Sequence, residues 1–453
     1  MQETILSDLS PVSSDKAVDS VDVVIIGGGI VGVTTALFLA RQGVSVMVCE
    51  KGVVGGEQSC RNWGWCRTQS RDPRELPMVL QSLRLWDRMN EMVEDETGFR
   101  RCGILTLYDR PGEIADAELW MEHAKEHQVK SRLIGSDEIS RLIPDASRKF
   151  AAGLYTPDDG RAEPTRAAPA IARAAQRLGA KIITNCAVRG VDFKGGRVAG
   201  VITERGRVTC SSVVLAGGAW SSLMCSSLGI RLPQLKLLAC VQRTAPFEGP
   251  EADISVWGPG FTFRRNIDNS YTSAFGQSNE VQITPDSFRY FFDFLPRLKQ
   301  EFNTVRLRVG RRSLDELNWS RGWKLDEVTP FERVRILNPD PLDYDTAAAQ
   351  RNLRSVFPMF EKASIVRKWA GLVDATPDAV PVISSVEETP GFFIATGFSG
   401  HGFCAGPAAG QMMSEIVVGD TPTVDPTPYR FDRLGRAPKL RSDVMDERPQ
   451  PNL

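Results

Sequence analysis

Three glycines near the start of the chain have the spacing that a dinucleotide phosphate requires. Gly27, Gly29 and Gly32 form a G-x-G-x-x-G pattern between a β-branched run and an apolar stretch of helical character. Such a turn exposes the free N–H groups at the start of a helix, which bind a pyrophosphate. Glu50 follows 18 residues after Gly32, where a carboxylate accepts hydrogen bonds from ribose hydroxyls. Because that negative charge disfavours a phosphorylated ribose, the pattern indicates FAD or NAD rather than NADP.

A single βαβ unit must position these residues. The pattern predicts a strand at residues 21–26, a helix at 30–42 and a second strand at 44–49. The alternative is a membrane helix, since residues 23–40 are almost continuously apolar. Three consecutive glycines interrupt that run and an acid ends the next strand at the right distance, so the dinucleotide interpretation is favoured.

The composition is that of a globular chain with room for two domains. It has 453 residues, 42% of them hydrophobic and 25% charged, and the net charge of −1 favours neither nucleic acid nor an anionic membrane. Nine scattered cysteines without a C-x-x-C pair favour thiols kept reduced in a cytoplasm. His123 and His127 lie four residues apart in a polar helical stretch with no third ligand nearby, so no metal site is expected.

The order of strands and helices predicts an α/β fold with two domains. A Rossmann-like nucleotide domain is expected to be discontinuous and to comprise residues 21–75, 160–235 and 366–432. The second domain comprises residues 76–159 and 236–365, and it is expected to bind substrate on an α+β framework with a mixed or antiparallel sheet.

Both ends of the chain are expected to lie outside these domains. Residues 1–20 carry several charges and no continuous apolar run, so they do not form a secretory signal and predict a flexible lead-in. Residues 433–453 are expected to form a tail. Elsewhere, the alternating arginines of 305–312 favour a half-exposed strand or helix face over a pocket lining, and residues 73–100 have the apolar spacing of a helix.

Three more glycine-rich segments could bring backbone against a planar ligand. Residues 52–72 form a loop rich in Gly, Ser, Asn and Arg, and a short predicted strand stops at Gly217. Residues 397–417 give a glycine loop that runs into a helix. In that helix Gly406 and Gly410 are four residues apart, a spacing that lets it approach another backbone closely.

Taken together, these segments resemble the D-amino-acid-oxidase-like family of FAD-dependent oxidoreductases, which includes glycine oxidase, monomeric sarcosine oxidase and D-amino-acid dehydrogenases. The resemblance covers most of residues 21–430 and is closest to the sarcosine-oxidase branch. It rests on the βαβ unit ending at Glu50, an S-x-R-N-x-G loop starting at Ser59, the strand end LAGGAW, and the motif WAGL...TPD..P followed by GFSGHGF.

The resemblance implies an extended FAD. Adenosine is expected at Glu50 and near Val188, pyrophosphate on the glycine turn and Ser59, and isoalloxazine between the loops 61–65 and 399–404. A helix that begins near the second loop would point its positive end at the flavin edge where negative charge accumulates on reduction. The expected cofactor-binding residues are Gly27, Gly29, Ile30, Val31, Gly32, Glu50, Lys51, Ser59, Arg61, Asn62, Gly64, Trp65, Val188, Ala216, Gly217, Trp220, Gly371, Gly400, His401, Gly402 and Phe403.

Two departures from the sarcosine-oxidase pattern matter. Members of that branch tether FAD through a cysteine just before their T-P-D, and Gly371 stands at that position, so FAD is expected to be non-covalent. They also place a lysine after G-H-G-F to hold a substrate carboxylate, where this chain has Cys404. A neutral thiol cannot replace that charge, so Arg67 is the candidate to hold a carboxylate. His401 is expected to tune the substrate or flavin edge by hydrogen bonding.

The function implied by the resemblance is oxidation of an amine or amino acid by an oxidase or dehydrogenase. A hydride passes to flavin N5, and the resulting imine hydrolyses to a keto acid or an aldehyde. Electrons then go to O2 or to an electron-transfer acceptor. The alternatives are a flavin hydroxylase, whose usual G-D motif is absent before the last helix, and a non-catalytic flavin-binding subunit of a larger complex.

Overall fold

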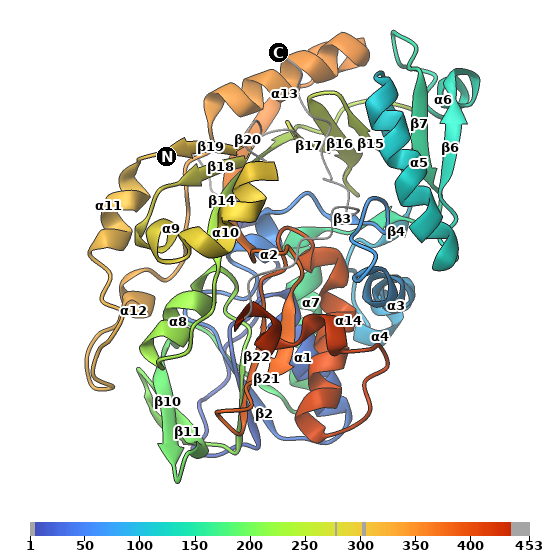
Figure 1. The fold of residues 1–453 in the computed structure, drawn as a ribbon. Coiled ribbons are helices and arrows are strands. Elements are labelled where there is room, and N and C mark those ends of the chain that lie inside the picture. The colour runs from blue at the N-terminus through green and yellow to red at the C-terminus, as the bar shows by residue number, and fades with distance from the viewer. Residues whose placement is uncertain (1–4, 277–278, 301–304, 436–453) are drawn as a thin grey trace.

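A computed structural model describes residues 5–276, 279–300 and 305–435 (Figure 1). A six-stranded sheet in the order β21-β22-β13-β1-β2-β9 forms its nucleotide-binding part. All neighbouring strands are parallel except β21, which runs antiparallel to β22. The strands are β1 (Val23–Ile26), β2 (Val46–Cys49), β9 (Lys181–Ile183), β13 (Ser212–Leu215), β21 (Val382–Ser385) and β22 (Phe392–Thr396).

Both faces of this sheet are covered, which explains why its central strands are apolar throughout. Alternate residues face opposite sides, so Val23 and Ile25 pack against helices while Val24 and Ile26 pack toward a three-stranded sheet. The helices are α1 (Ile30–Arg41), α7 (Pro164–Arg177) and α14 (Gly402–Val418), and the small sheet is β10 (Val188–Lys194), β11 (Arg197–Thr203) and β12 (Gly206–Thr209).

Helices α1 and α14 approach each other closely, as the glycine spacing predicts. A Cβ atom on Gly410 would lie 2.7 Å from Cβ of Thr34, and one on Gly406 would lie 2.9 Å from Cγ1 of Ile30. The absence of side chains at these two positions lets the last long helix pack along the first one. The two ends of the chain's nucleotide-binding part are thereby joined.

A second, larger sheet is mixed, as expected. Its path is β19-β18-β14-β17-β16-β15-β5-β7-β6, and β20 pairs with β14 along ten residue pairs. Most neighbours are antiparallel, while β15–β5 and β18–β19 are parallel. The strands are β5 (Ile104–Tyr108), β6 (Arg132–Gly135), β7 (Ala152–Thr156), β14 (Leu235–Thr244), β15 (Ser255–Gly258), β16 (Phe261–Arg265), β17 (Tyr271–Ala274), β18 (Asn279–Gln282), β19 (Val305–Arg308) and β20 (Ile365–Ala375).

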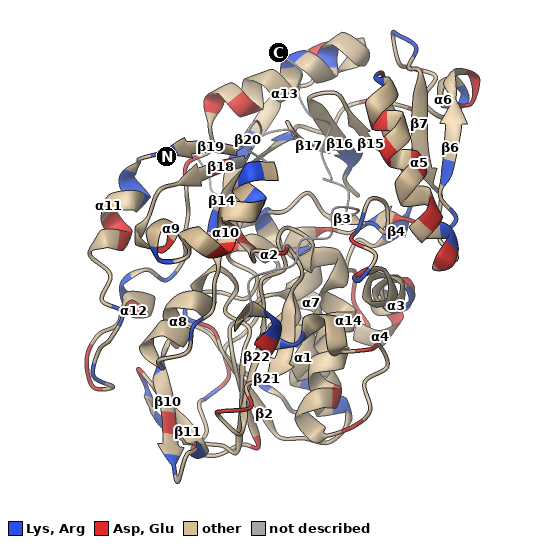
Figure 2. Cartoon of the chain, in the orientation of Figure 1, with Lys and Arg blue, Asp and Glu red and all other residues tan. Residues whose placement is uncertain are grey.

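Shorter elements connect and cover the two sheets. Acidic and basic residues are interspersed over them, for example along α5 and α13 (Figure 2). No helix in the described part of the chain is both long enough and apolar enough to cross a bilayer. The remaining helices are α2 (Gln58–Arg61), α3 (Leu76–Asp87), α4 (Met89–Val93), α5 (Pro111–Glu126), α6 (Ser136–Leu142), α8 (Ser221–Ser227), α9 (Pro285–Arg289), α10 (Phe291–Gln300), α11 (Arg311–Leu317), α12 (Pro330–Arg333) and α13 (Asp343–Val356). The remaining strands and 3-10 turns are β3 (Trp65–Cys66), β4 (Arg100–Arg101), β8 (Gly160–Arg161), η1 (Ile5–Asp8), η2 (Gly218–Trp220), η3 (Pro358–Lys362), η4 (Thr427–Tyr429) and η5 (Phe431–Gly435).

Several expectations from the sequence can now be compared with the structure. The helix expected at 73–100 is two helices, α3 and α4, because Arg88 leaves helical geometry with φ −104° and ψ 2°. Within the lead-in expected at residues 1–20, Ile5 is buried, and Asp8 forms ion pairs that bind it to the large sheet. The half-exposed strand expected within 305–312 is confirmed as β19. Of the expected tail, residues 436–453 lie outside the described part.

Candidate active site

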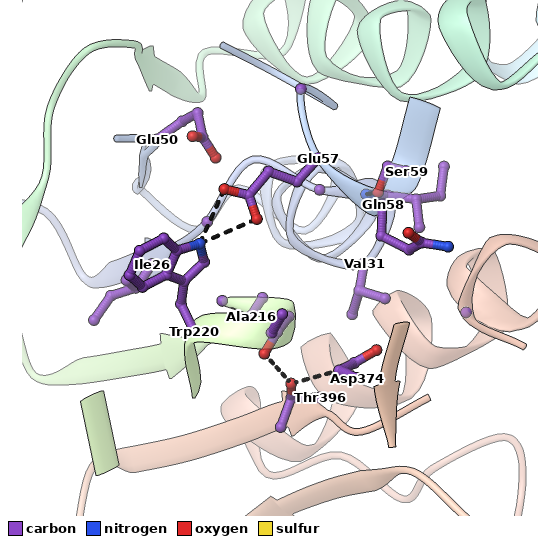
Figure 3. A pocket seen from close by; sticks show the side chains of 18 of the residues that line it. Ile26, Val31, Glu50, Glu57, Gln58, Ser59, Ala216, Trp220, Asp374 and Thr396 are labelled. Atoms are coloured by element: carbon purple, nitrogen blue, oxygen red, sulfur yellow. Dashed lines mark hydrogen bonds between the residues drawn. The ribbon is translucent and has the colours of Figure 1, made fainter. Parts of the chain in front are cut away.

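A cavity lies at the carboxyl ends of the central parallel strands (Figure 3). Ile26 ends β1, Cys49 ends β2 and Leu215 ends β13, and all three residues line it. Open parallel sheets bind ligands at this edge, where the strand order changes direction. Further along, residues from β20 and from the start of α14 line the same cavity. It is therefore built from segments that span nearly the whole chain.

The glycine turn after β1 is packed too tightly for side chains. Gly27 has φ +110°, and a Cβ atom there would lie 2.5 Å from the carbonyl oxygen of Ala216. A Cβ atom on Gly32 would lie 2.1 Å from the carbonyl oxygen of Gly27. At the start of α1, the N–H of Ile30 donates to Ser59 Oγ at 2.9 Å. Backbone donors and a hydroxyl thus meet where a pyrophosphate would bind.

Glu50 lies at the end of β2 and is held by backbone donors. Its carboxylate accepts hydrogen bonds from the N–H of Gly28 at 2.8 Å and from the N–H of Gly52 at 2.6 Å. Burial raises the pKa of Glu50, while these two donors and the nearby Lys51 oppose that shift. Glu50 lines the cavity, and its carboxylate is the group predicted from the sequence to bind the ribose hydroxyls of the cofactor.

Most of the expected cofactor-binding residues line this cavity. They come from the glycine turn, the end of β2, α2, the start of β10, the end of β13 and the start of α14. The lining includes Gly27, Gly29, Ile30, Val31, Glu50, Lys51, Ser59, Asn62, Val188, Ala216, Gly217, Trp220, Gly400, Gly402 and Phe403.

The other expected residues lie behind the cavity wall. Arg61 is buried and donates through Nη1 to Asn338 Oδ1 at 2.8 Å and to the Ala370 carbonyl at 3.0 Å, so it connects the α2 loop to the large sheet. A Cβ atom on Gly371 would lie 2.2 Å from Gln58 Oε1. The expected residues that do not line the cavity are Gly32, Arg61, Gly64, Trp65, Arg67, Gly371 and His401.

Glu57 is a functional candidate that the sequence did not indicate. Its carboxylate accepts a hydrogen bond from Trp220 Nε1 at 2.9 Å (Figure 3). It also accepts hydrogen bonds from Lys51 Nζ at 2.7 Å and from the N–H of Leu337 at 3.1 Å. The Lys51 ammonium also lies 4.3 Å from the Trp220 ring centroid. These contacts join partners as far as 280 residues apart, and no local motif predicts them.

A segment between the two sheets also closes one side of the cavity. Phe331 and Ile336 line it, although the sequence places them in the second domain. Lys51 Nζ donates to the carbonyls of Val334 and Arg335. The two terminal nitrogens of the Arg335 guanidinium, Nη1 and Nη2, donate to the Glu204 carboxylate. The covering segment, residues 329–337, is thus fixed to the nucleotide-binding part by charged hydrogen bonds.

The other end of the cavity is formed by the start of α14 and by a buried acid on β20. Asp374 lines the cavity and accepts hydrogen bonds from the N–H of Gly397 at 2.7 Å and from Thr396 Oγ1 at 3.2 Å. Burial raises its pKa. The carboxylate orders the turn before α14, whose first residues Gly402 and Phe403 face the cavity with the positive end of the helix.

Arg67 lies beside this end of the cavity without lining it. Its guanidinium carbon is 5.5 Å from the Trp257 ring centroid, and its carbonyl accepts from the Cys404 thiol at 3.7 Å. Asp159, fully buried, accepts hydrogen bonds from the N–H groups of Thr68 and Gln69 and so fixes the loop that carries Arg67. Burial raises the pKa of Asp159 to about 6, against the effect of those donors.

The described residues contain no group of three potential metal ligands. His123 lies on α5 with Nδ1 3.7 Å from Glu126 Oε2, and both side chains reach the surface. His127 is the C-terminal cap of the same helix, and His401 Nδ1 lies 2.9 Å from Glu75 Oε2. The expected role of His401 at the substrate or flavin edge stays a prediction, and the structure adds this contact with a buried acid.

This arrangement is that of a dinucleotide-binding protein whose cofactor would lie across the sheet edge. FAD fits the residues present: the glycine turn leaves room only for backbone, Glu50 lies at the ribose position, and the buried Gln58 Oε1 in the cavity lining has no hydrogen-bond partner among the described residues. A model of the FAD-dependent oxidoreductase family DAO matches residues 22–416. The chain belongs to this family, and it is an FAD-dependent enzyme.

Several known proteins are similar over most of the chain. The structure of L-amino acid deaminase from Proteus myxofaciens in complex with anthranilate shares 34% identity at a TM-score of 0.90, over 94% of this chain and 96% of that one. Sarcosine oxidase subunit beta from Arthrobacter sp is 26% identical over 92% of this chain and 91% of its own length. 4-Methylaminobutanoate oxidase (formaldehyde-forming) from Paenarthrobacter nicotinovorans is also 26% identical over 93% of this chain, which spans 46% of that relative.

Proposed function

We propose that this protein oxidises the C–N bond of an amine or amino acid to an imine, which water hydrolyses to a keto acid or aldehyde. The observation that carries the proposal is the cavity, which continues from the ribose-binding end to the start of α14 and Asp374. Each of the similar proteins is named for an amine or amino-acid substrate. A flavin hydroxylase and a non-catalytic flavin-binding subunit are the alternatives.

Bound FAD would supply the hydride acceptor, and the residues of the chain would supply orientation and charge. The turn 27–32 and Glu50 would hold the adenosine diphosphate half, leaving the reactive half at the α14 end. The N–H groups that begin α14 would stabilise negative charge as it develops there. No residue of the chain needs to act as a strong acid or base, because the substrate nitrogen enters deprotonated.

Arg67 would hold the carboxylate of an amino-acid substrate from its place beside this end. A guanidinium binds a carboxylate through two parallel hydrogen bonds, and Lys offers only a point charge. We therefore expect Arg67→Met to lower kcat/KM for carboxylate-bearing substrates by about a hundredfold, or ~3 kcal/mol, with Arg67→Lys intermediate. The matched control is an amine substrate without a carboxylate, for which both variants should resemble the wild type. An equal loss for both substrate types would remove Arg67 from this role.

FAD is proposed to be non-covalent, since Gly371 offers no side chain for a tether. Acid precipitation should therefore release all flavin into the supernatant, and flavin that remains with the pellet would contradict this. The nine cysteines are all free, which supports a cytoplasmic location. The electron acceptor is proposed to be O2 or a redox partner protein, and comparing peroxide formation with dye reduction during turnover separates the two.

The experiment that tests the proposal is a turnover screen of the FAD-loaded protein with an artificial dye. The panel contains D- and L-amino acids, N-alkyl amino acids and simple amines, and the products measured are the carbonyl compound and the released amine. Equimolar carbonyl and amine from at least one substrate is the expected result. Oxygen incorporated into an aromatic substrate, with consumption of a reduced nicotinamide, would instead support the hydroxylase.

A further inference from the structure

Glu75 and His401 form a buried pair directly behind the N-terminus of α14. Glu75 Oε2 lies 2.9 Å from His401 Nδ1, and Glu75 is completely buried. His401 is the residue before α14, and its neighbours Gly400 and Gly402 both line the cavity. Neither side chain lines the cavity, but His401 stands between two residues that do, whereas the chain neighbours of Glu75 do not.

The surroundings of Glu75 favour an ion pair. Glu75 Oε1 is buried and has no hydrogen-bond partner among the described residues. Arg74 adjoins it in sequence, but the Arg74 guanidinium is engaged by Asp72 at 2.6 Å and by Asp378 at 3.5 Å. The hydroxyl of Tyr429 donates to the Arg74 carbonyl rather than to Glu75. His401 is an ionisable group in hydrogen-bond contact with this carboxyl group, and an imidazolium there would compensate a carboxylate charge.

Helix α3 fixes this pair relative to α14. Glu75 stands at the N-terminal end of α3, and Trp86 Nε1 near the other end donates to the Cys404 carbonyl at 2.9 Å. Ser82 Oγ contacts the same carbonyl and also accepts from the N–H of Ala408 at 3.3 Å. Three hydrogen bonds thus join α3 to the first two turns of α14, at Cys404 and Ala408.

We propose that Glu75 is a positioning residue that keeps His401 as an imidazolium, so that a full positive charge supplements the N-terminus of α14 at the reactive end of the cavity. This rests on the proposed function for the placement of the flavin's reactive half. The charge favours reduced flavin because reduction accumulates negative charge there. Because His401, and not Glu75, adjoins the cavity-lining residues, the pair would have a net positive effect on the cavity.

The test is the two-electron midpoint potential of bound FAD, measured against a reference dye. Glu75→Gln removes the counter-charge, and the buried His401 then becomes neutral. We expect the equilibrium constant for flavin reduction to fall about tenfold, which is ~30 mV for a two-electron couple. His401→Gln should cause a similar fall, and the double variant should show no further change, because one pair is lost in all three.

Glu415→Gln is the matched control. Glu415 is also a buried acid on α14, but it lies near the other end, ~20 Å from Gly402 at the rise of a helix. Its variant should leave the potential unchanged. A rise in the potential of Glu75→Gln would mean that Glu75 is a carboxylate beside a neutral His401. An unchanged potential would mean that neither residue of the pair is charged. Either result overturns the proposal.

Should Glu75→Gln fail to retain FAD, His401→Gln decides alone, and a wild-type potential in that variant contradicts the proposal. The potential requires no amine substrate. A protein that shows the expected shift but that no amine reduces would refute the proposed function while leaving the role of the pair intact.

Discussion

The two ends of the cavity are stabilised in different ways. At the ribose end, residues 23–50 form a continuous unit in which backbone groups make the contacts and close packing excludes side chains. At the other end, beside α14, buried ionisable groups such as Asp374 and the Glu75–His401 pair come from distant parts of the chain. The first end should be sensitive to added volume, and the second to charge and pH.

The largest effect is expected from added volume at the ribose end. A Cβ atom in Gly32→Ala would lie 2.1 Å from a backbone oxygen that cannot move without opening the turn. We expect this variant to yield no FAD-loaded protein, as measured by flavin absorbance after gel filtration. Gly112→Ala is the control, because nothing lies within 4 Å of its Cβ position. Normal FAD content in Gly32→Ala would mean that close packing does not define this end.

The next effect concerns pH at the reactive end. Asp159 holds the Arg67 loop, and its pKa is raised from 3.8 to about 6 by burial. Because the folded state binds this proton more tightly than the unfolded state, the free energy of unfolding should fall as pH rises from 3.8 to about 6 and then stay level. The fall is on the order of 3 kcal/mol from one fully buried group.

Asp159→Asn isolates this contribution because the amide does not titrate. Denaturant unfolding of both proteins over this pH range gives the difference in unfolding free energy at each pH. This difference should change by on the order of 3 kcal/mol between pH 4 and pH 6, and it should remain constant above pH 6. Parallel pH profiles would show that Asp159 has an ordinary pKa and that charge burial is less important at this end.

The smallest effect is expected where the covering segment meets the nucleotide-binding part. The Arg335–Glu204 ion pair is partly exposed, so Arg335→Ala should accelerate FAD dissociation only about fivefold, or ~1 kcal/mol. Stopped-flow fluorescence of released flavin measures this rate. Arg333→Ala, an exposed arginine in the same segment, should leave the rate unchanged. An unchanged rate for Arg335→Ala would show that the segment does not control cofactor release.

The same contrast explains what the sequence could predict. The strands β1 and β2, helix α1 and the position of Glu50 follow from residues that are neighbours in the chain, because glycine spacing and apolar periodicity are local signals. The family resemblance added Ser59, Ala216 and the start of α14, and these residues do line the cavity.

What could not be predicted depends on contacts between distant segments. Glu57 contacts Leu337, and Glu75 contacts His401, which lies 326 residues further along the chain. No local sequence pattern predicts either contact. Ile336 lines the cavity although the periodicity placed it in the second domain. His401 was assigned to the substrate or flavin edge from its place between two glycines, and that place gives no sign of the buried carboxyl group that its ring contacts.

The central claim is that the α14 end of the cavity delivers substrate electrons to FAD, and anaerobic reduction tests it most directly. FAD-loaded protein is mixed with each member of the amine and amino-acid panel without oxygen, and the visible flavin absorbance is followed. At least one compound should bleach the flavin completely, in a single phase whose rate saturates with substrate concentration. Protein that binds FAD fully, is reduced by dithionite and is bleached by none of these compounds would contradict the claim.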